Sequence, residues 1–486
     1  MYGDNSSKVQ LERRYKKQGQ NCSTIPSLTL YIRREGMPFE KSQAMSETCC
    51  GTWELVASAC CAAEAPPPYL AGYSVETPPC PTGCVDCTQH QTPPCCVLLE
   101  VTRSCNLGCP VCFADSVTDS CSVAGNTCCD PSLDTIATWL DSLYRRAGAC
   151  HIQLSGGEPT LRDDLCSIIC IGRERGFSFF QLNTNGLRLA TEPSLAQQLK
   201  AAGLTCVFLQ FDGMSDEVHK ALRGAELQAI KEAAVEACAA AQLPVILVPT
   251  LARGVNEQEL MGLIRYGIEK SPIVRGIHIQ PMARFGRVEL PGAQLVEPLS
   301  IAEVLAALET QSAGMIRAEH FSGGSAEHPA CSFNAHYFIT DDGNLVPSGT
   351  QHPSCCGTTQ DAVEHAREIQ ARRWGTDLAD ALMPRPPVGT MDEFLWQNKA
   401  RSFEITGMAF MDEQTLDLER LRRCYLFIID PQGIPIPFCA YNIAHRQNAI
   451  QAYGGGVTPD TETQSCTTAC HDEAKPEPAD KGCCCG

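Results

Sequence analysis

The sequence predicts an α/β fold: a partial (β/α)6 barrel of the TIM type, with a Cys-rich N-terminal segment and an α+β C-terminal extension. Three observations predict it. Short apolar, β-branched runs alternate with helical stretches of about 10 to 15 residues, which is typical of βα units around a parallel sheet. The runs are continuously apolar, as expected for strands buried on both faces. Polar and cysteine-bearing loops follow the runs, where strand ends share one rim of such a barrel.

The six expected βα units follow one another from residue 95. Each strand is an apolar run, and each helix is a longer stretch with an apolar and a charged side. The expected strands are 95–102, 150–156, 179–186, 206–213, 245–251 and 276–282. The expected helices lie near 131–147, 161–175, 192–202, 225–241, 256–270 and 299–311. Because crossover connections are right-handed, the carboxyl ends of the strands share one face.

Around this core the chain divides into five expected parts. The extension contains two apolar runs on either side of DPQG, which predict a hairpin. The end of the chain is rich in Gly, Thr, Asp, Glu and Pro and is expected to be disordered. The parts are a Cys-containing N-terminal segment (1–79), a Cys-rich link (80–96), the core barrel (97–314), the C-terminal extension (315–454) and the tail (455–486).

Composition limits the classes of function. The net charge of -18 argues against a nucleic-acid partner, because phosphate binding needs clustered Lys and Arg. The sequence has no signal peptide and no uncharged apolar stretch of about 20 residues, so no transmembrane segment is expected. We expect a cytoplasmic protein, in which the 31 cysteines indicate metal or redox chemistry more than disulfides. A disulfide-rich secreted protein is the alternative.

Three cysteines form the most informative motif. The stretch CNLGCPVC places Cys105, Cys109 and Cys112 in a C-x3-C-x2-C spacing, in the loop after the first strand. Three thiolates at this spacing can each bind one iron of a [4Fe–4S] cube, which leaves the fourth iron open for a substrate or cofactor. A structural zinc site would need a fourth thiolate and would keep no open position.

The loops after later strands carry glycine-rich and polar motifs. SGGEP follows the second strand, NTNG the third, DG the fourth and QPM the sixth. Gly156 and Gly157 would let the backbone approach a ligand closely, and Glu158 could pair with an ammonium group. GGEP alone would indicate only a tight turn. Five such loops on one rim, the cysteine loop among them, indicate a cofactor-binding catalytic site.

At these motifs the sequence resembles the radical SAM superfamily, over about residues 96–285. The resemblance implies that Cys105, Cys109 and Cys112 bind a [4Fe–4S] cluster whose open iron chelates S-adenosylmethionine. One electron would then cleave this cofactor to methionine and a 5′-deoxyadenosyl radical, which abstracts a hydrogen atom. The resemblance assigns to cofactor binding Gly156, Gly157, Glu158 and Pro159 at the methionine moiety, Asn183, Thr184, Asn185, Gln210 and Asp212 near the ribose, and also Arg223 and Gln280.

Longer stretches resemble particular branches of that superfamily. IQLSGGEPTLRDDL and RGIHIQPMARFGR are similar to the branch that holds the tetraether lipid synthases and their methylase relatives. EHPACSF and the stretch from GMAFMDEQ to PFCAYN are most similar to TrsS-type radical SAM (seleno)proteins. The resemblance implies C–H functionalisation or alkyl transfer on a small-molecule or lipid-like substrate. It also implies a reductant protein such as a flavodoxin or ferredoxin.

Further cysteines upstream of the barrel form a candidate auxiliary iron–sulfur site. Cys80, Cys84 and Cys87 repeat the C-x3-C-x2-C spacing, and Cys95 or Cys96 could supply a fourth ligand. A zinc knuckle or free thiols are the alternatives. The stretch is similar to an auxiliary-cluster segment of the related family, whose members begin with a zinc-ribbon-like module. That module is degenerate here, because the N-terminal segment lacks the expected cysteine pair and histidine.

A second candidate auxiliary set lies in the extension. It comprises Cys331, Cys424 and Cys439, with Cys355 or Cys356 as a fourth ligand. Since free cysteine is among the most buried residue types, a core thiol is the competing interpretation for each.

Two other functions stay open. Vicinal cysteines recur along the chain, and soft thiolates bind thiophilic metals and metalloids. The enzyme could therefore transfer an aminocarboxypropyl group from the cofactor to an acceptor such as arsenite. A non-catalytic, thiol-rich metal-binding protein is the alternative from another class, but it leaves GGEP and NTNG without a role.

Overall fold

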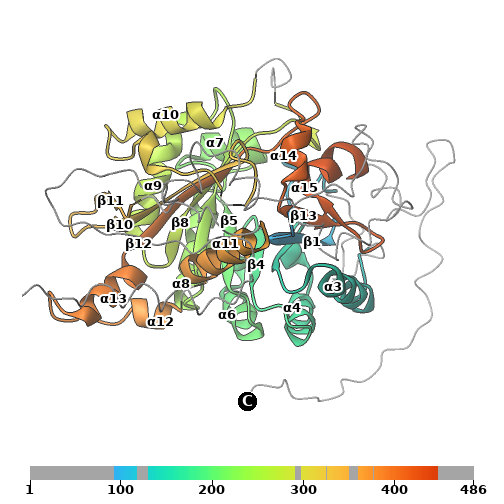
Figure 1. Ribbon diagram of the computed structural model, residues 1–486, viewed down its shortest axis with the longest axis horizontal. Helices are drawn as coiled ribbons and strands as arrows, with labels where there is room; N and C mark the ends of the chain where they lie inside the picture. Colours follow the sequence, from blue (N-terminus) through green and yellow to red (C-terminus); the bar gives the residue numbers. More distant parts are fainter. Residues whose placement is uncertain are drawn as a thin grey trace, which may run out of the picture. The chain divides into compact units, whose positions relative to one another are not determined.

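A 12-stranded sheet lies at the centre of the structure (Figure 1). The computed structural model describes residues 92–117, 130–290, 297–324, 326–349, 359–375 and 377–446, which fall in one compact unit. The strands of the sheet are β1 (Cys96–Thr102), β3 (His151–Gly156), β4 (Phe180–Thr184), β5 (Cys206–Gln210), β6 (Val245–Val248), β7 (Thr250–Leu251), β8 (Val274–Pro281), β10 (Ser332–Ile339), β11 (Leu345–Pro347), β12 (Ser402–Met408), β13 (Leu426–Ile429) and β14 (Pro435–Pro437). Their order is β11-β10-β12-β8-β6-β5-β4-β3-β1-β13-β14, and β7 pairs with β8.

A run of parallel strands forms most of the sheet. It extends from β12 through β8, β6, β5, β4, β3 and β1 to β13. Every residue of β1, and every residue of β6, is buried, as expected for strands covered on both faces. The edges end in antiparallel pairs, β10 with β11 and β13 with β14, so the barrel is open. The predicted partial (β/α)6 barrel is thereby confirmed.

The C-terminal extension contributes strands to both edges of the barrel. β12 adds a parallel strand beside β8, and β13 adds another beside β1. The expected hairpin around DPQG is present as β13 and β14. The sequence did not predict that these remote strands would continue the core sheet, because no local pattern encodes pairing across so long a separation. The residue bounds of the five parts stay a prediction.

The helices of the βα units pack on the sheet through one apolar side. In α3, for example, Ile136, Leu140 and Leu143 are buried, and Ser132 caps the first turn by accepting a hydrogen bond from Thr135 N. The helices are α3 (Leu133–Ala147), α4 (Leu165–Glu174), α5 (Leu187–Thr191), α6 (Pro193–Ala202), α7 (Asp216–Arg223), α8 (Gln228–Ala240), α9 (Leu260–Glu269), α10 (Ile301–Gln311), α11 (Thr359–Trp374), α12 (Leu378–Ala381), α13 (Met391–Ala400), α14 (Leu418–Arg422) and α15 (Phe438–Ala440). Short 3-10 turns Pro159–Leu161, Glu257–Glu259 and Ala318–His320 and a π-helical turn Tyr441–His445 complete the elements.

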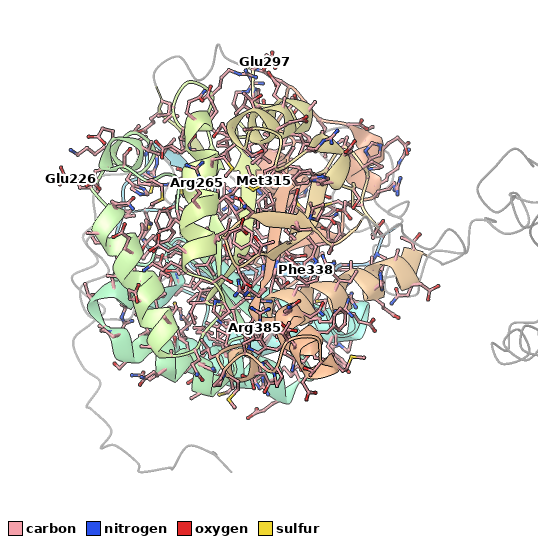
Figure 2. All side chains as sticks on the ribbon, turned by 90° about the vertical axis from the view of Figure 1, so that its left-hand side faces the viewer. Glu226, Arg265, Glu297, Met315, Phe338 and Arg385 are labelled. Carbon is pink, nitrogen blue, oxygen red and sulfur yellow. The ribbon has the colours of Figure 1, made fainter. Side chains whose placement is uncertain are left out.

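The outer surface and the inner face of the sheet differ in character. Exposed charged side chains such as Glu226, Arg265 and Glu297 project from the outer elements (Figure 2). On the inner face, Trp374 of α11 packs with Phe208 and neighbouring strand residues in one buried cluster. The extension thus supplies both edge strands and an inner helix to the barrel.

Several predictions fall on residues that the structure does not describe. The N-terminal segment (1–79), the disordered tail (455–486) and the candidate ligands Cys80, Cys84 and Cys87 lie outside the described residues. Cys355 and Cys356 also lie outside them. In the described part of the chain, no helix is both long enough and apolar enough to cross a membrane.

Candidate active site

The loop that carries the three cysteines leaves the end of β1 and is held by the GGEP turn after β3. Gly157 N donates to Thr102 O at 2.8 Å, and Glu158 N donates to Ser104 O at 2.8 Å. A Cβ at Gly157 would lie 2.1 Å from Ser104 O, and a Cβ at Gly156 would lie 2.1 Å from Thr102 O. Both glycines are therefore required for the two backbones to meet. The close approach expected toward a ligand is here made toward the cysteine loop.

The carboxylate of Glu158 joins GGEP to the NTNG loop after β4. It is 1% exposed and accepts hydrogen bonds from Thr160, from Thr184 Oγ1 at 2.7 Å and from Asn185 N at 2.7 Å. Asn185 Nδ2 in turn donates to Asn106 Oδ1, within the cysteine loop, at 2.7 Å. The motifs after three successive strands are thus connected through buried and partly buried hydrogen bonds.

A buried ion pair anchors the rim from the other side. Arg223 at the end of α7 donates twice to Asp212, at 2.8 Å each, and once to Val111 O in the cysteine loop at 3.0 Å. Burial alone would raise the pKa of Asp212, but the guanidinium of Arg223 outweighs it and holds that pKa below its ordinary value. Asp212 is therefore ionised, and its carboxylate holds the guanidinium of Arg223 in place.

Three further cations surround the site, and the sequence analysis missed all of them. Arg287 donates to Cys109 O at 2.9 Å, and Arg446 donates to Ala114 O at 3.2 Å and to Glu100. Lys231 is fully buried in α8 and donates to Asn185 O at 2.6 Å. No motif marks these residues, because each acts on a backbone carbonyl brought near it only by the fold.

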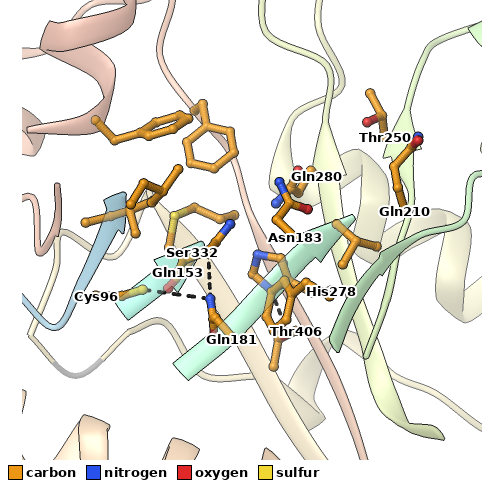
Figure 3. A pocket seen from close by; sticks show the side chains of 18 of the residues that line it. Cys96, Gln153, Gln181, Asn183, Gln210, Thr250, His278, Gln280, Ser332 and Thr406 are labelled. Carbon is orange, nitrogen blue, oxygen red and sulfur yellow. Dashed lines mark hydrogen bonds between the residues drawn. The ribbon is translucent and has the colours of Figure 1, made fainter. Parts of the chain in front are cut away.

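A cavity of about 340 Å³ opens at this rim and continues along the inner face of the sheet (Figure 3). It brings together most of the predicted site. The candidates that line it are Cys96, Cys105, Cys109, Cys112, Gly156, Gly157, Glu158, Asn183, Thr184, Asn185, Gln210, Arg223 and Gln280. Pro159 and Asp212 lie behind the lining, where Pro159 begins a short helical turn and Asp212 pairs with Arg223.

The three loop cysteines fit an iron–sulfur cluster by the chemistry of their donors. They are free thiols and pack in one cluster of side chains with Leu107 and Leu227. Burial raises the pKa of Cys105 to about 12, so the metal-free thiol keeps its proton. Among the described residues, no three His, Cys, Asp or Glu side chains converge as ligands of one metal ion. A [4Fe–4S] cube does not need the three thiolates to converge on one point, because each thiolate binds a different iron.

The cysteines of the extension gather although they are far apart in sequence. Cys331 and Cys439 lie close enough to Cys424 to raise the pKa of its thiol, Cys331 acts likewise on Cys439, and burial is the main cause that raises all three pKa values. Arg420 Nε donates to Cys331 Sγ at 3.4 Å, and Met411 N donates to Cys439 Sγ at 3.4 Å. These cysteines lie outside the lining of the main cavity, although their neighbours Tyr425 and Phe438 belong to it.

The open parallel barrel with a three-cysteine loop facing glycine-rich turns defines an enzyme built around a cofactor on its strand-end rim. Comparison with known proteins identifies the family. The sequence model of the radical SAM superfamily matches residues 99–267. The 7,8-dihydro-6-hydroxymethylpterin dimethyltransferase of Methanocaldococcus jannaschii is 30% identical over 421 residues, which are 77% of this chain and 81% of that protein. The chain belongs to the radical SAM superfamily.

Two more similarities are narrower. A probable GTP 3′,8-cyclase of Pyrococcus abyssi is 31% identical over 185 residues, 37% of this chain and 56% of the relative. The radical SAM enzyme coproporphyrinogen III oxidase from Escherichia coli matches with a TM-score of 0.33 and 12% identity, over 48% of this chain and 54% of that one. The chain is thus a radical SAM enzyme that uses a [4Fe–4S] cluster and S-adenosylmethionine. The similarity to the TrsS-type and tetraether synthase branches stays a prediction.

Proposed function

We propose that Cys105, Cys109 and Cys112 hold the [4Fe–4S] cluster and that the enzyme transfers an alkyl group to a small molecule bound in the cavity. The observation that supports this proposal is the joining of the cysteine loop to GGEP and NTNG by buried and partly buried hydrogen bonds beside that cavity. When bound, the cluster and S-adenosylmethionine together supply a 5′-deoxyadenosyl radical. Alkyl transfer is proposed because the relative from Methanocaldococcus jannaschii is named a dimethyltransferase.

The residues on the rim are proposed to bind S-adenosylmethionine in a fixed order. The backbone of Gly156, Gly157 and Glu158, with Pro159 behind it, would hold the methionine moiety. Asn183, Thr184, Asn185 and Gln210 would face the ribose, with Gln280 on the opposite strand, and Asp212 would act through Arg223. The support is that all but Pro159 and Asp212 line the cavity together with the cysteines.

Product analysis in an anaerobic reaction tests this function. Protein with its cluster reconstituted, S-adenosylmethionine and a strong reductant should release 5′-deoxyadenosine. Cys105→Ala should abolish that product, whereas Cys170→Ala, at an exposed position on α4, should leave it unchanged. Release of an aminocarboxypropyl product would support transfer to an acceptor such as arsenite instead. Neither product, with the cluster confirmed by iron and sulfide content, would favour a thiol-rich metal-binding protein.

We propose further that Cys331, Cys424 and Cys439 bind an auxiliary iron–sulfur cluster. The support is their convergence beside the cavity wall and the positive charge of Arg420 at Cys331. A second auxiliary site with Cys80, Cys84 and Cys87 stays a prediction, and Cys96, its expected fourth ligand, lies on β1 and lines the cavity. Changing Cys331, Cys424 and Cys439 together to Ala should lower the iron content by about four per chain. An unchanged iron content would refute the site in the extension.

The cellular setting is proposed from redox chemistry. Every described cysteine is a free thiol, as expected in a reducing compartment such as the cytoplasm. The reaction needs one electron at a time, so a flavodoxin or ferredoxin is the proposed reductant protein. Replacing the chemical reductant by either protein, with its reductase, should sustain formation of 5′-deoxyadenosine.

A further inference from the structure

Primary amides, Gln153 and Gln181 among them, project into the part of the cavity that lies along the inner face of the sheet (Figure 3). Gln153 and Gln181 are direct partners in the register of β3 and β4, so their side chains lie beside each other. Asn183 lies two residues further along β4 and therefore on the same face. Gln280 enters from β8. Asn183 and Gln280, which are proposed to contact the cofactor, border this space, and we call Gln153, Gln181, Phe208 and Trp374 the amide chamber.

The amide chamber contains polar atoms without a protein partner. Gln181 Nε2 donates to Gln153 Oε1 at 2.5 Å and contacts Cys96 Sγ at 3.8 Å. Gln181 is 2% exposed, and its Oε1 has no hydrogen-bond partner among the described residues. Trp374 Nε1 is also buried and has no hydrogen-bond partner among the described residues. A buried acceptor and a buried donor that stay unpaired destabilise a protein, which indicates that a ligand pairs with them.

Charged groups in the cavity wall are paired or shifted toward their neutral form, and burial raises the pKa of Glu327, which lies beside Ser332. Arg373 pairs with Glu404, and Arg223 pairs with Asp212, so these cations are balanced. His278 contacts Thr406 at 2.9 Å, and burial lowers its pKa to about 4, which keeps the imidazole uncharged. A ligand that fits here is therefore uncharged where it meets the amides.

Two aromatic side chains give the amide chamber flat walls. The rings of Phe208 and Trp374 meet edge to face, with centroids 5.0 Å apart and an interplanar angle of 64°. His278 lies against Phe208 with a centroid distance of 5.7 Å. Such walls suit a planar ring. An alkyl chain would fill the same space but would leave Gln181 Oε1 and Trp374 Nε1 without partners.

We propose that the amide chamber binds the substrate as a neutral aromatic heterocycle with a cyclic amide edge, whose adjacent N–H and C=O pair with Gln181 and Gln153. This inference rests on the proposed function, because it names the substrate class for the same cavity. A primary amide offers one acceptor and two donors, which match that edge in both directions. The free Gln181 Oε1 accepts the ring N–H, and an amide N–H group of Gln153 donates to the ring C=O.

Equilibrium dialysis under anaerobic conditions tests the proposal. The full chain, with its cluster and saturating S-adenosylmethionine, is dialysed against pterin, guanine, N3-methylpterin or 1-O-hexadecylglycerol. At least one of pterin and guanine should be retained, and N3-methylpterin should bind about tenfold more weakly than pterin because its methyl group removes the N–H donor. Gln181→Leu should weaken retention of the unmethylated ring about tenfold. Gln181→Glu, which keeps the shape but adds charge, should weaken it too.

Matched controls separate this inference from the proposed function. Gln198→Leu, on the exposed side of α6, should change nothing. Gln198→Leu should also keep wild-type iron content and wild-type formation of 5′-deoxyadenosine, so these two measurements report on the proposed function and ring retention reports on the amide chamber. If no variant and no wild-type protein forms 5′-deoxyadenosine, the proposed function fails. If the product forms but neither ring is retained, N3-methylpterin binds equally well or hexadecylglycerol binds more tightly, only the amide chamber proposal is overturned.

Discussion

The rim of the cavity and the amide chamber differ in how their polar groups are satisfied. At the rim, Glu158 accepts four hydrogen bonds within the chain, and Arg223 has Asp212, Val111 O and Thr250 as partners. In the amide chamber, Gln181 keeps a buried acceptor that no described residue meets. The rim is therefore fixed before any ligand arrives, whereas the amide chamber is completed by one.

The difference fits the separate roles proposed for the two regions, cofactor binding at the rim and substrate binding in the amide chamber. A cofactor that is always the same can be held by a network that also stabilises the fold. A substrate must enter and leave, so its partners are left free at a cost in stability. Changes at the rim should consequently reduce stability and cluster binding, while changes in the amide chamber should affect ligand choice and little else.

Gly157→Ala is expected to have the largest effect. Its Cβ would lie 2.1 Å from Ser104 O and 2.6 Å from Ser104 C, and neither backbone atom can move without displacing the cysteine loop. We expect iron content and formation of 5′-deoxyadenosine to fall to background. Gly254→Ala is the control, because its Cβ would meet nothing within 4 Å although its φ of 76° carries some strain. Normal iron content in Gly157→Ala would show that the contact between the two loops is dispensable.

Asp212→Asn should come second, through stability. The change leaves the guanidinium of Arg223 buried without its counter-ion, which typically lowers the free energy of unfolding by about 3–5 kcal/mol. Urea denaturation of the anaerobic protein measures it. Asp380→Asn, which breaks a pair between exposed side chains of Asp380 and Lys399, should have little effect. Equal losses in the two variants would mean that the rim pair is no more important than a surface pair.

Gly157 and Asp212 also show how much of the site could be predicted from the sequence. The strands and the rim motifs were predictable, because period, composition and the C-x3-C-x2-C spacing are local signals. The position of Asp212 behind the cavity lining could not be predicted, because the sequence does not show which carboxylate pairs with Arg223. His278 lies on β8, inside the sheet. It is hydrogen-bonded as a core histidine would be, and it also lines the cavity.

The amide chamber lay beyond sequence analysis for a physical reason. Its glutamines lie inside strands. A glutamine there interrupts an apolar run, but its distance in sequence from the residues it contacts follows no motif. Gln153, Gln181 and Phe208 come from β3, β4 and β5, which only the sheet order brings around one space. Trp374 reaches it from α11, in the extension. Contacts of this kind depend on long-range packing, which no motif encodes.

Lys231→Met should have a smaller effect that depends on pH. Burial is the main cause that lowers the pKa of Lys231 from 10.5 to about 8. At pH values between about 8 and 10.5, Lys231 binds a proton in the unfolded chain more often than in the folded chain. The free energy of unfolding of the wild type therefore rises with pH in this range. We expect the wild type to gain about 1 to 2 kcal/mol over the variant between pH 8 and 9.5.

Urea denaturation at the two pH values checks the prediction for Lys231. Lys200→Met is the matched control, because Lys200 also donates to a backbone carbonyl, that of Gln242, but at an exposed site. Its stability difference from the wild type should not change over the same range. A difference for Lys231→Met that stays constant from pH 8 to 9.5 would contradict the lowered pKa of Lys231.

Gln181→Leu is expected to have the smallest effect on stability, and it tests the comparison most directly. Leucine removes the unpartnered Oε1, which favours the folded state, and it also removes the bond to Gln153. Because Gln153 is only half-buried, the loss of its partner costs little, and the two effects are expected to offset each other. The urea midpoint should therefore stay within about 1 kcal/mol of the wild type or rise. A loss as large as that of Asp212→Asn would show that Gln181 is part of the fold, as the rim residues are. A neutral or positive change, combined with loss of ring binding, would show a residue retained for its ligand at the expense of stability.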